Sequence, residues 1–370
     1  MPEGLTTVNS WAFYYCTGLE TLTLPSTLHT MGENAFDNCK GLSSILIPGS
    51  LKTIPKRAFN YCTGLEEVII SDGIEVVGEG AFNNCQTLKK VVMADSVKTL
   101  EKDTFYGCSK LSDIKLSNNL ELIGDSAFTS GYALTNITIP DTVTTMGAYA
   151  FSYSGLTTID IPLNVKSIQG NTFNGCKDLE SINVNEENLT YSSLEGVLFS
   201  KDKKTLIFYP CGKKDTEYFI PNEVTTINSS SFSYITALET VIISGNITDL
   251  PSNFSGCTAL KIIVVPDSVT TVNDFIFYGS DFTKIYTHKN SVFENRAKEN
   301  TYKAYTDDVI FYLGDMDGDK IIEKSDSASV IRKAFDASSV TGTEKYIADA
   351  NCDNAVDILD AVHILNRTDA

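Results

Sequence analysis

A phenylalanine recurs at an interval of 23 residues through the first half of the chain, and this period restricts the fold more than any other feature. The positions are Phe13, Phe36, Phe59, Phe82, Phe105, Phe128 and Phe151, with Phe173 following after 22 residues. A fixed period of this length is typical of solenoids, in which each unit stacks on the one before it. Length alone would have suggested two or three globular domains for 370 residues.

Each unit also carries a strand pattern, and the first five units carry a cysteine. The pattern LxxLxL predicts one short parallel strand per unit, as at Leu19, Leu22 and Leu24. The returning half of the unit is expected to bury its phenylalanine between coils. Cysteines keep the same period at Cys16, Cys39, Cys62, Cys85 and Cys108. Equivalent buried positions favour reduced thiols that act as small apolar side chains, with pairing of stacked neighbours as the alternative.

The repeat has the consensus L-x-x-[IL]-x-[IL]-P-x-x-[VL]-x-x-[IM]-G-x-x-[AT]-F-x-x-C and resembles the BspA-like leucine-rich repeats of bacterial surface proteins. The resemblance covers about residues 5 to 287. It implies a repeat solenoid with one short parallel strand per 23-residue coil, and a role in binding rather than catalysis.

Two interruptions divide the chain further. Residues 190–209 predict a hairpin that leaves the solenoid, with strands GVLF and TLIFY joined by SKDKK. Residues 288–312 predict a short polar helix and a strand, which would cap the last coil. We therefore expect a leucine-rich repeat solenoid at 1–287, a cap and linker at 288–312, and a separate module at 313–370.

The last variable position of LxxLxL is expected to form a column on the concave face, pointing away from the core. Most of that column is mixed, but two stretches are apolar. The candidate partner-binding residues of this face are Leu46, Ile69, Val92, Ile242, Ile262, Val264 and Tyr286. Contiguous exposed apolar side chains indicate an interaction site. The alternative is that valine and isoleucine occur there because they suit strands.

The module at 313–370 contains two acidic twelve-residue loops, DMDGDKIIEKSD at 315–326 and DANCDNAVDILD at 349–360, each followed by an apolar helix pattern. In calcium loops of the EF-hand type, oxygen ligands come from positions 1, 3, 5, 7, 9 and 12. The corresponding candidates are Asp315, Asp317, Asp319, Ile321 (carbonyl), Glu323 and Asp326 in the first loop, and Asp349, Asn351, Asp353, Ala355 (carbonyl), Asp357 and Asp360 in the second. Solvated acidic turns are the alternative interpretation.

The loops depart from the EF-hand in two ways. Position 6 is Lys320 or Asn354 rather than glycine, and position 12 is aspartate rather than glutamate. No helix pattern precedes either loop. Tandem loop-helix units of this kind resemble the type I dockerin of bacterial cellulosomes, over residues 313–370. The resemblance implies a small all-α module that binds two calcium ions and docks onto a cohesin of a scaffold protein.

In dockerins, selectivity is carried at loop positions 10 and 11 and on the helix that follows. The resemblance therefore implies cohesin contacts from Lys324, Ser325, Ser329, Arg332 and Lys333 in the first repeat, and from Ile358, Leu359, His363, Asn366 and Arg367 in the second. Because the two sets differ, we expect one preferred binding mode, anchored by Ile358 and Leu359. The alternative is that these two residues pack inside a module too small to spare apolar side chains.

Charge and composition exclude several functions. The formal net charge of −18 makes nucleic acid and anionic membranes poor partners. Only three histidines are present, far apart in sequence, so no Ser-His-Asp or Cys-His arrangement is expected. We therefore predict a non-catalytic, extracellular binding protein whose natural chain begins upstream of Met1. A carbohydrate-active enzyme, or a regulator within a polysaccharide-degrading complex, is the alternative.

Overall fold

The computed structural model describes residues 1–370 except 253, 279–280, 300–304, 307–308, 317, 336–339, 341, 343, 357 and 369–370. The described chain forms two compact units. The first comprises Met1–Lys201 and Pro210–Gly212, and the second Asp202–Tyr209 and Lys213–Ala370. The predicted boundary between residues 312 and 313 thus lies inside the second unit.

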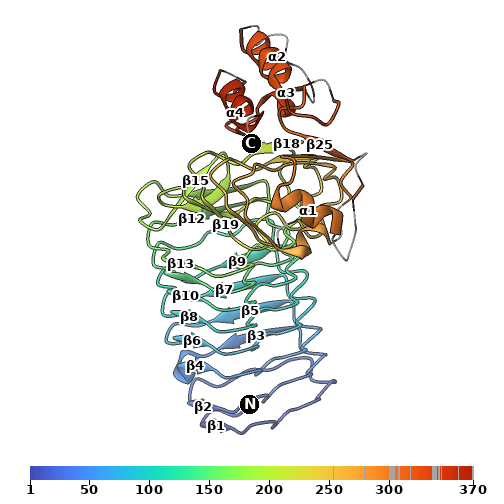
Figure 1. Cartoon of the computed structure of the whole chain (residues 1–370). Coiled ribbons are helices and arrows are strands. Elements are labelled where there is room, and N and C mark those ends of the chain that lie inside the picture. The colour runs from blue at the N-terminus through green and yellow to red at the C-terminus, as the bar shows by residue number, and fades with distance from the viewer. Residues whose placement is uncertain are drawn as a thin grey trace. The chain divides into compact units, whose positions relative to one another are not determined.

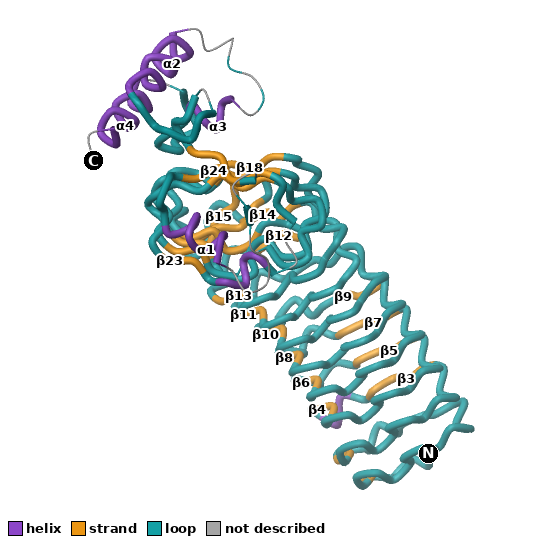
Figure 2. The backbone as a smooth tube through the Cα atoms, turned by 45° about the vertical axis from the view of Figure 1, so that its right-hand side comes forward, coloured by secondary structure: helices purple, strands orange, loops and turns teal. Residues whose placement is uncertain are grey.

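The first unit is a parallel solenoid with strands on two sides of its coils (Figures 1 and 2). One side carries β3 (Ser44–Ile47), β5 (Glu67–Ile70), β7 (Lys90–Met93), β9 (Asp113–Lys115), β12 (Thr158–Ile161) and β14 (Ser181–Val184). The other carries two-residue strands, namely β1 (Thr7–Val8), β2 (Thr30–Met31), β4 (Thr53–Ile54), β6 (Val76–Val77), β8 (Thr99–Leu100), β10 (Leu122–Ile123), β11 (Thr145–Met146) and β13 (Ser167–Ile168). A 3-10 turn, η1 (Gly49–Leu51), precedes β4.

The phenylalanine ladder forms the core of this unit. Successive rings from Phe13 to Phe173 stack with centroids 5.1 to 6.0 Å apart and planes within 12° of parallel. The strand register matches the sequence period, since β3 pairs with β5 and β5 with β7 in parallel at an offset of 23 residues. The period therefore predicted both the stacking partners and the register.

Apart from the exposed Cys16, the cysteine ladder is a set of buried thiols. All nine cysteines lie in the described part of the chain, and none of them forms a disulfide there. The thiol of Cys62 donates to the carbonyl of Phe36 at 3.2 Å, and Cys85 and Cys108 repeat this contact one and two coils later. Burial raises the pKa of Cys108 to about 12. The ladder is therefore a packing and hydrogen-bonding element.

This arrangement predicts a simple alkylation pattern. At about pH 8 we expect iodoacetamide to modify only Cys16, which is exposed, whereas the other eight cysteines are buried. Because burial raises the pKa of the ladder thiols, the thiolate grows only as the pH approaches 11 to 12. Denaturation should make all nine reactive. Mass spectrometry of intact protein measures this, and a buried cysteine reacting as fast as Cys16 would contradict the packing.

A hairpin ends the regular coils of the first unit. β15 (Tyr191–Leu194) pairs antiparallel with β16 (Val197–Ser200). Glu195 and Gly196 join them, both with positive φ, as a two-residue type I′ turn requires. The sequence pattern predicted the GVLF strand but not β15. The TLIFY segment forms β17 (Thr205–Phe208), which belongs to the second unit and pairs in parallel with β19 (Thr226–Ile227).

The second unit also contains parallel coils, and it adds helices. Its main parallel sheet contains β18 (Glu217–Phe219), β20 (Thr240–Ile242), β22 (Ile262–Val264), β24 (Lys284–Thr287) and β25 (Ile310–Tyr312). The opposite side has β21 (Asp249–Leu250), β23 (Thr271–Val272) and the 3-10 helix η2 (Asp274–Phe277). The helices are α1 (Val292–Glu299), α2 (Lys324–Phe335), α3 (Glu344–Ala348) and α4 (Ile358–Thr368).

Two expectations for this unit have clear outcomes. The segment 288–312 contains a helix, α1, and a strand, β25, which adds to the sheet beside β24 with Tyr286 opposite Phe311. The expectation that no helix precedes either acidic loop is wrong for the second loop, since α3 ends at Ala348. Its five residues are too few for a helical period to be visible in the sequence.

Candidate binding faces and acidic loops

The first unit carries an open apolar strip on the predicted column. Leu46, Ile69 and Val92 are register partners on β3, β5 and β7. The side chain of Leu46 is 53% exposed and that of Ile69 is 37% exposed, while Val92 is partly buried. An ion pair joins Glu67 of β5 to Lys90 of β7, with 2.9 Å between the nitrogen and the oxygen. The strip is thus an apolar surface bordered by charge.

Farther along the same unit the column becomes polar and the surface is hollowed. A cavity of about 360 Å³ is lined by residues of three successive coils, including Thr138, Asp160 and Asn183. The side-chain amide of Asn183 donates to Asp160 Oδ1 at 2.9 Å. Hydrogen-bonding groups within a hollow suit a polar ligand better than the flat apolar strip does.

In the second unit the predicted column is covered. Ile242, Val264 and Tyr286 are register partners but are only 3%, 1% and 1% exposed. They form one cluster with Leu313, Tyr346 and Cys352, against which Phe219, Ile262 and Ile347 also pack. The expectation that Ile242, Ile262, Val264 and Tyr286 form an open binding face is therefore corrected. Their apolar character serves packing against the C-terminal segment.

Polar contacts reinforce this packing. Glu217 on β18 accepts hydrogen bonds from the Lys345 ammonium and the Tyr346 hydroxyl of α3. Burial, together with the adjacent Glu217 carboxylate, raises the pKa of Tyr346, so the phenol stays protonated as a donor. The side-chain amide of Asn222 donates to the carbonyl of Asp353 at 3.1 Å. Residues 313–370 are thus bound to the repeat strands of their own unit by apolar and polar contacts together.

The first acidic loop is folded around its carboxylates. Asp315 accepts from the backbone N–H groups of Gly318 and Lys320, each at 2.9 Å. Asp326, at position 12, accepts from the N–H groups of Met316 and Glu323 at 2.7 and 2.8 Å. Asp315 and Asp326 are buried, at 5% and 1% exposure. Position 3, Asp317, lies outside the described residues.

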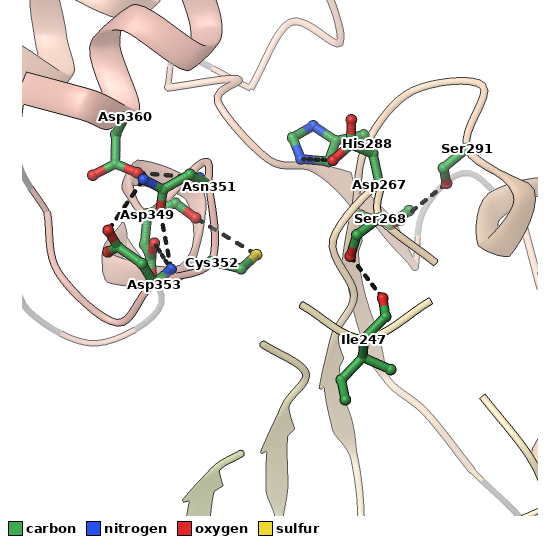
Figure 3. A network of polar contacts seen from close by, with 11 residues as sticks. Ile247, Asp267, Ser268, His288, Ser291, Asp349, Asn351, Cys352, Asp353 and Asp360 are labelled. Atoms are coloured by element: carbon green, nitrogen blue, oxygen red, sulfur yellow. Dashed lines mark hydrogen bonds and ion pairs between the residues drawn. The ribbon is translucent and has the colours of Figure 1, made fainter. Parts of the chain in front are cut away.

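The second loop repeats this arrangement (Figure 3). Asp349 accepts from the N–H groups of Asp353 and Asn354, and Asp360 accepts from the N–H of Asn351 at 3.1 Å. Asp353 Oδ1 accepts from the N–H of Ala355 at 2.9 Å, as Asp319 Oδ1 does from Ile321 in the first loop. Position 9, Asp357, lies outside the described residues.

Position 6 adopts the backbone conformation that normally selects glycine. Lys320 has φ of 67° and Asn354 has φ of 69°. This is the left-handed region, which asparagine tolerates and lysine adopts at a cost in conformational energy. The missing glycine therefore does not prevent either loop from making the sharp turn.

The carboxylates of the second loop repel one another. Burial, and next the negative charge of Asp360, raise the pKa of Asp349 to about 7, while the N–H groups of Asp353 and Asn354 oppose the rise. Asp360 itself is fully buried. Two carboxyl groups held together in this way are stabilised by a positive charge placed between them.

Helices α2 and α4 pack against each other behind the loops. Val330 of α2 and Ala361 and Ile364 of α4 share a core cluster with Ala348 and Ala350. The hydroxyl of Ser327 donates to the carbonyl of Ala361 at 3.1 Å.

The residues expected to contact a cohesin lie in several environments. Lys324 and Ser325 are exposed, and Leu359 is 57% exposed. The Ser329 hydroxyl donates to the carbonyl of Ser325 at 3.1 Å, and Lys333 forms a 2.7 Å ion pair with Glu344. Leu359 therefore does not pack inside the module, which excludes for this residue the alternative to a contact surface. The side chains of Arg332, Ile358, Asn366 and Arg367 lie outside those described.

Sequence reasoning missed several residues of this surface. Val362, one turn beyond Leu359 on α4, is 46% exposed. The helix period could have placed it beside Leu359, since residues three apart lie on one face. His363 is half-buried, and its ring centroid lies 5.3 Å from that of His288. Nothing in the sequence relates residues so far apart.

Comparison with known proteins identifies the repeats. Residues 1–112, 98–205 and 204–304 match the family described as BspA type leucine rich repeat region, in six copies. The chain belongs to the BspA-type leucine-rich repeat family. The acidic loops, at 315–326 and 349–360, lie beyond the region that matches the BspA-type repeat. A search of curated proteins finds no match.

Solved structures agree with this membership. A leucine rich cell surface protein from Faecalibacterium prausnitzii is 28% identical, with a TM-score of 0.62, over 77% of this chain and 83% of that one. A leucine-rich repeat protein from Eubacterium ventriosum is 26% identical, with a TM-score of 0.54, over 61% of each chain. One from Bacteroides ovatus, at 22% identity and a TM-score of 0.50 over 84% and 88%, shares the fold. None of the helices in the described part of this BspA-type chain has the length and hydropathy needed to cross a bilayer.

Proposed function

We propose that this chain is a non-catalytic extracellular binding protein that presents a leucine-rich repeat face and attaches to a scaffold through residues 313–370. Membership of the BspA-type family supports the binding role, and the similar Faecalibacterium prausnitzii protein is described as a cell surface protein. The ligand face in this proposal is the strip of Leu46, Ile69 and Val92, with the hollow around Asp160 as a second surface suited to polysaccharide.

We propose further that each acidic loop binds one calcium ion. The matched carboxylates at positions 1, 5 and 12 of both loops support this, because calcium takes oxygen ligands in loops of this length. Two of these carboxylates, Asp349 and Asp360, are buried near each other, and a divalent cation would offset their repulsion. Calcium, when bound, would supply the charge and coordination that fix the start of α2 and α4.

The docking partner in this proposal is a cohesin on a scaffold protein. The observation that carries it is the exposure of Leu359 and Val362 on α4, the helix that begins within the last three residues of the second acidic loop. The equivalent start of α2 presents Lys324 and Ser325 instead. An apolar patch in one repeat and a polar one in the other favours a single orientation on the partner, with Leu359 as its anchor.

Calorimetric titration of the full chain against a panel of cohesins tests this docking. We expect calcium-dependent binding to at least one cohesin, lost on adding a chelator. Leu359→Glu should weaken it about 100-fold, which corresponds to loss of one interface anchor worth about 2.7 kcal/mol. Leu189→Glu is the matched control, because Leu189 is 86% exposed in the first unit. Calcium-independent binding, or equal losses in both variants, would contradict the docking proposal.

A further inference from the structure

Three metal-ligating side chains meet in the second unit, and none of them belongs to either acidic loop. Asp267 follows β22 by three residues and His288 directly follows β24, and these two strands pair in parallel. His363 belongs to α4. One donor atom from each of the three side chains lies within 4.8 Å of the other two. Figure 3 shows Asp267 beside the ring of His288.

His288 is the unusual member of this cluster. Its side chain is 1% exposed, and neither ring nitrogen makes a well-formed hydrogen bond among the described residues, although the backbone of Ala350 lies near the ring. Buried polar groups without partners are rare because each has lost its contacts with water. A ring with both nitrogens unsatisfied and a carboxylate beside it therefore indicates an additional binding partner.

The protonation state of His288 suits a metal ligand. The His288 side chain is buried, and burial favours the neutral imidazole, which carries a lone pair, over the charged ring. Its Nε2 lies 4.0 Å from Asp267 Oδ1, and with a neutral ring this contact is no ion pair. Neutral imidazole is the form that coordinates transition metals.

We propose that Asp267, His288 and His363 bind a divalent transition metal of the zinc type. Two imidazoles and one carboxylate are typical ligands of zinc, whereas calcium prefers oxygen alone. In a tetrahedral zinc site the donor atoms are about 3.3 Å apart. The donor atoms of this cluster, which lie within 4.8 Å of one another, would therefore approach by about 1.5 Å or less when the metal binds. Asp267 is 41% exposed, which leaves a path for the ion and space for a water as fourth ligand.

The consequence of this site is a link between α4 and the repeat strands. Two ligands come from the solenoid and the third from the helix that follows the second acidic loop. The metal would thus join the C-terminal segment to β22 and β24 on the side of α4, independently of any calcium.

Zinc titration of the full chain tests this site. The titration is done with calcium in excess, so that the acidic loops are filled, and in a Cys16→Ser background, because Cys16 is the one exposed thiol. We expect one zinc ion per chain, a rise in melting temperature with zinc, and a tetrahedral absorption spectrum when cobalt replaces zinc. His363→Gln and Asp267→Asn should each weaken zinc binding at least tenfold and abolish the rise in melting temperature.

Two comparisons make the result decisive. His29→Gln, which changes the exposed histidine of the first unit, should bind zinc as tightly as the parent. Asp267→Asn removes a partly exposed carboxylate, so it serves if His363→Gln fails to fold. Absence of saturable zinc binding, or equal affinity in parent and Asp267→Asn, would overturn the proposal.

Discussion

Replacing Phe82 with alanine is expected to lower the free energy of unfolding of the first unit by about 3 to 5 kcal/mol, the usual cost of deleting a fully buried aromatic ring. Phe82 is 0% exposed and stacks on Phe59 and Phe105, with ring centroids 5.5 Å away on both sides. The cavity would interrupt the ladder between two coils. In a solenoid, whose stability is a sum of neighbour contacts, the gap also uncouples the coils on its two sides.

The matched control is Phe13→Ala. Phe13 occupies the same place in its repeat, stacks on Phe36 at 5.1 Å, and is only partly buried. We expect Phe13→Ala to lower the free energy of unfolding by roughly half as much as Phe82→Ala, because folding removes less of the Phe13 ring from water. Urea unfolding followed by circular dichroism gives both values, and a smaller slope for Phe82→Ala than for Phe13→Ala would show that the coils on its two sides unfold separately. Equal losses at the two positions would show that stacking between coils contributes little.

Replacing Asp360 with alanine should destabilise the second unit strongly when calcium is present. The proposed ion in the second loop would be lost, and with calcium at 100 times its dissociation constant that loss is about 2.7 kcal/mol. Asp360 also accepts a hydrogen bond from the Asn351 N–H. Without calcium the destabilisation should be smaller, because removing the Asp360 carboxylate relieves the repulsion that, after burial, raises the pKa of Asp349. The dependence on calcium distinguishes ligand loss from simple misfolding.

Calorimetry of calcium binding and thermal unfolding checks this result. Asp360→Ala should bind one calcium instead of two and melt at a lower temperature in calcium. Glu323→Ala is the control, because position 9 is exposed and often binds calcium only through water. A variant that still binds two calcium ions would refute the assignment of the second loop.

The packing of the second unit extends this prediction to the repeat strands. From sequence alone, loss of a loop should leave the solenoid unaffected. Because Tyr346 and Cys352 cover Ile242, Val264 and Tyr286, we instead expect faster amide hydrogen exchange in β20, β22 and β24 of Asp360→Ala. Unchanged exchange there would mean that the C-terminal segment stays in place without its second loop.

Periodic features were predictable from the sequence, and contacts between distant segments were not. The 23-residue period gave the phenylalanine stack and the strand register, because identical units can only pair in phase. The column residues Leu46 and Ile242 look alike in sequence, yet one is exposed and the other is covered by α3 and its neighbours. What covers a strand depends on tertiary packing, which no local pattern records. The cluster of Asp267, His288 and His363 could not be predicted from the sequence for the same reason.

The strict register of the first unit also limits how such a gene can change length. Each coil bonds to the next in the same way, with Leu46 opposite Ile69 and Ile69 opposite Val92. An in-frame duplication or loss of 69 nucleotides, one period of 23 residues, would add or remove a coil and leave every other side chain in its column. A gain or loss of one codon within a strand would turn the following side chains of that strand to its opposite face. A coil of 22 residues, by contrast, keeps Phe173 in the ladder because the missing residue lies outside the strands. The protein can therefore lengthen or shorten its binding arm in whole coils.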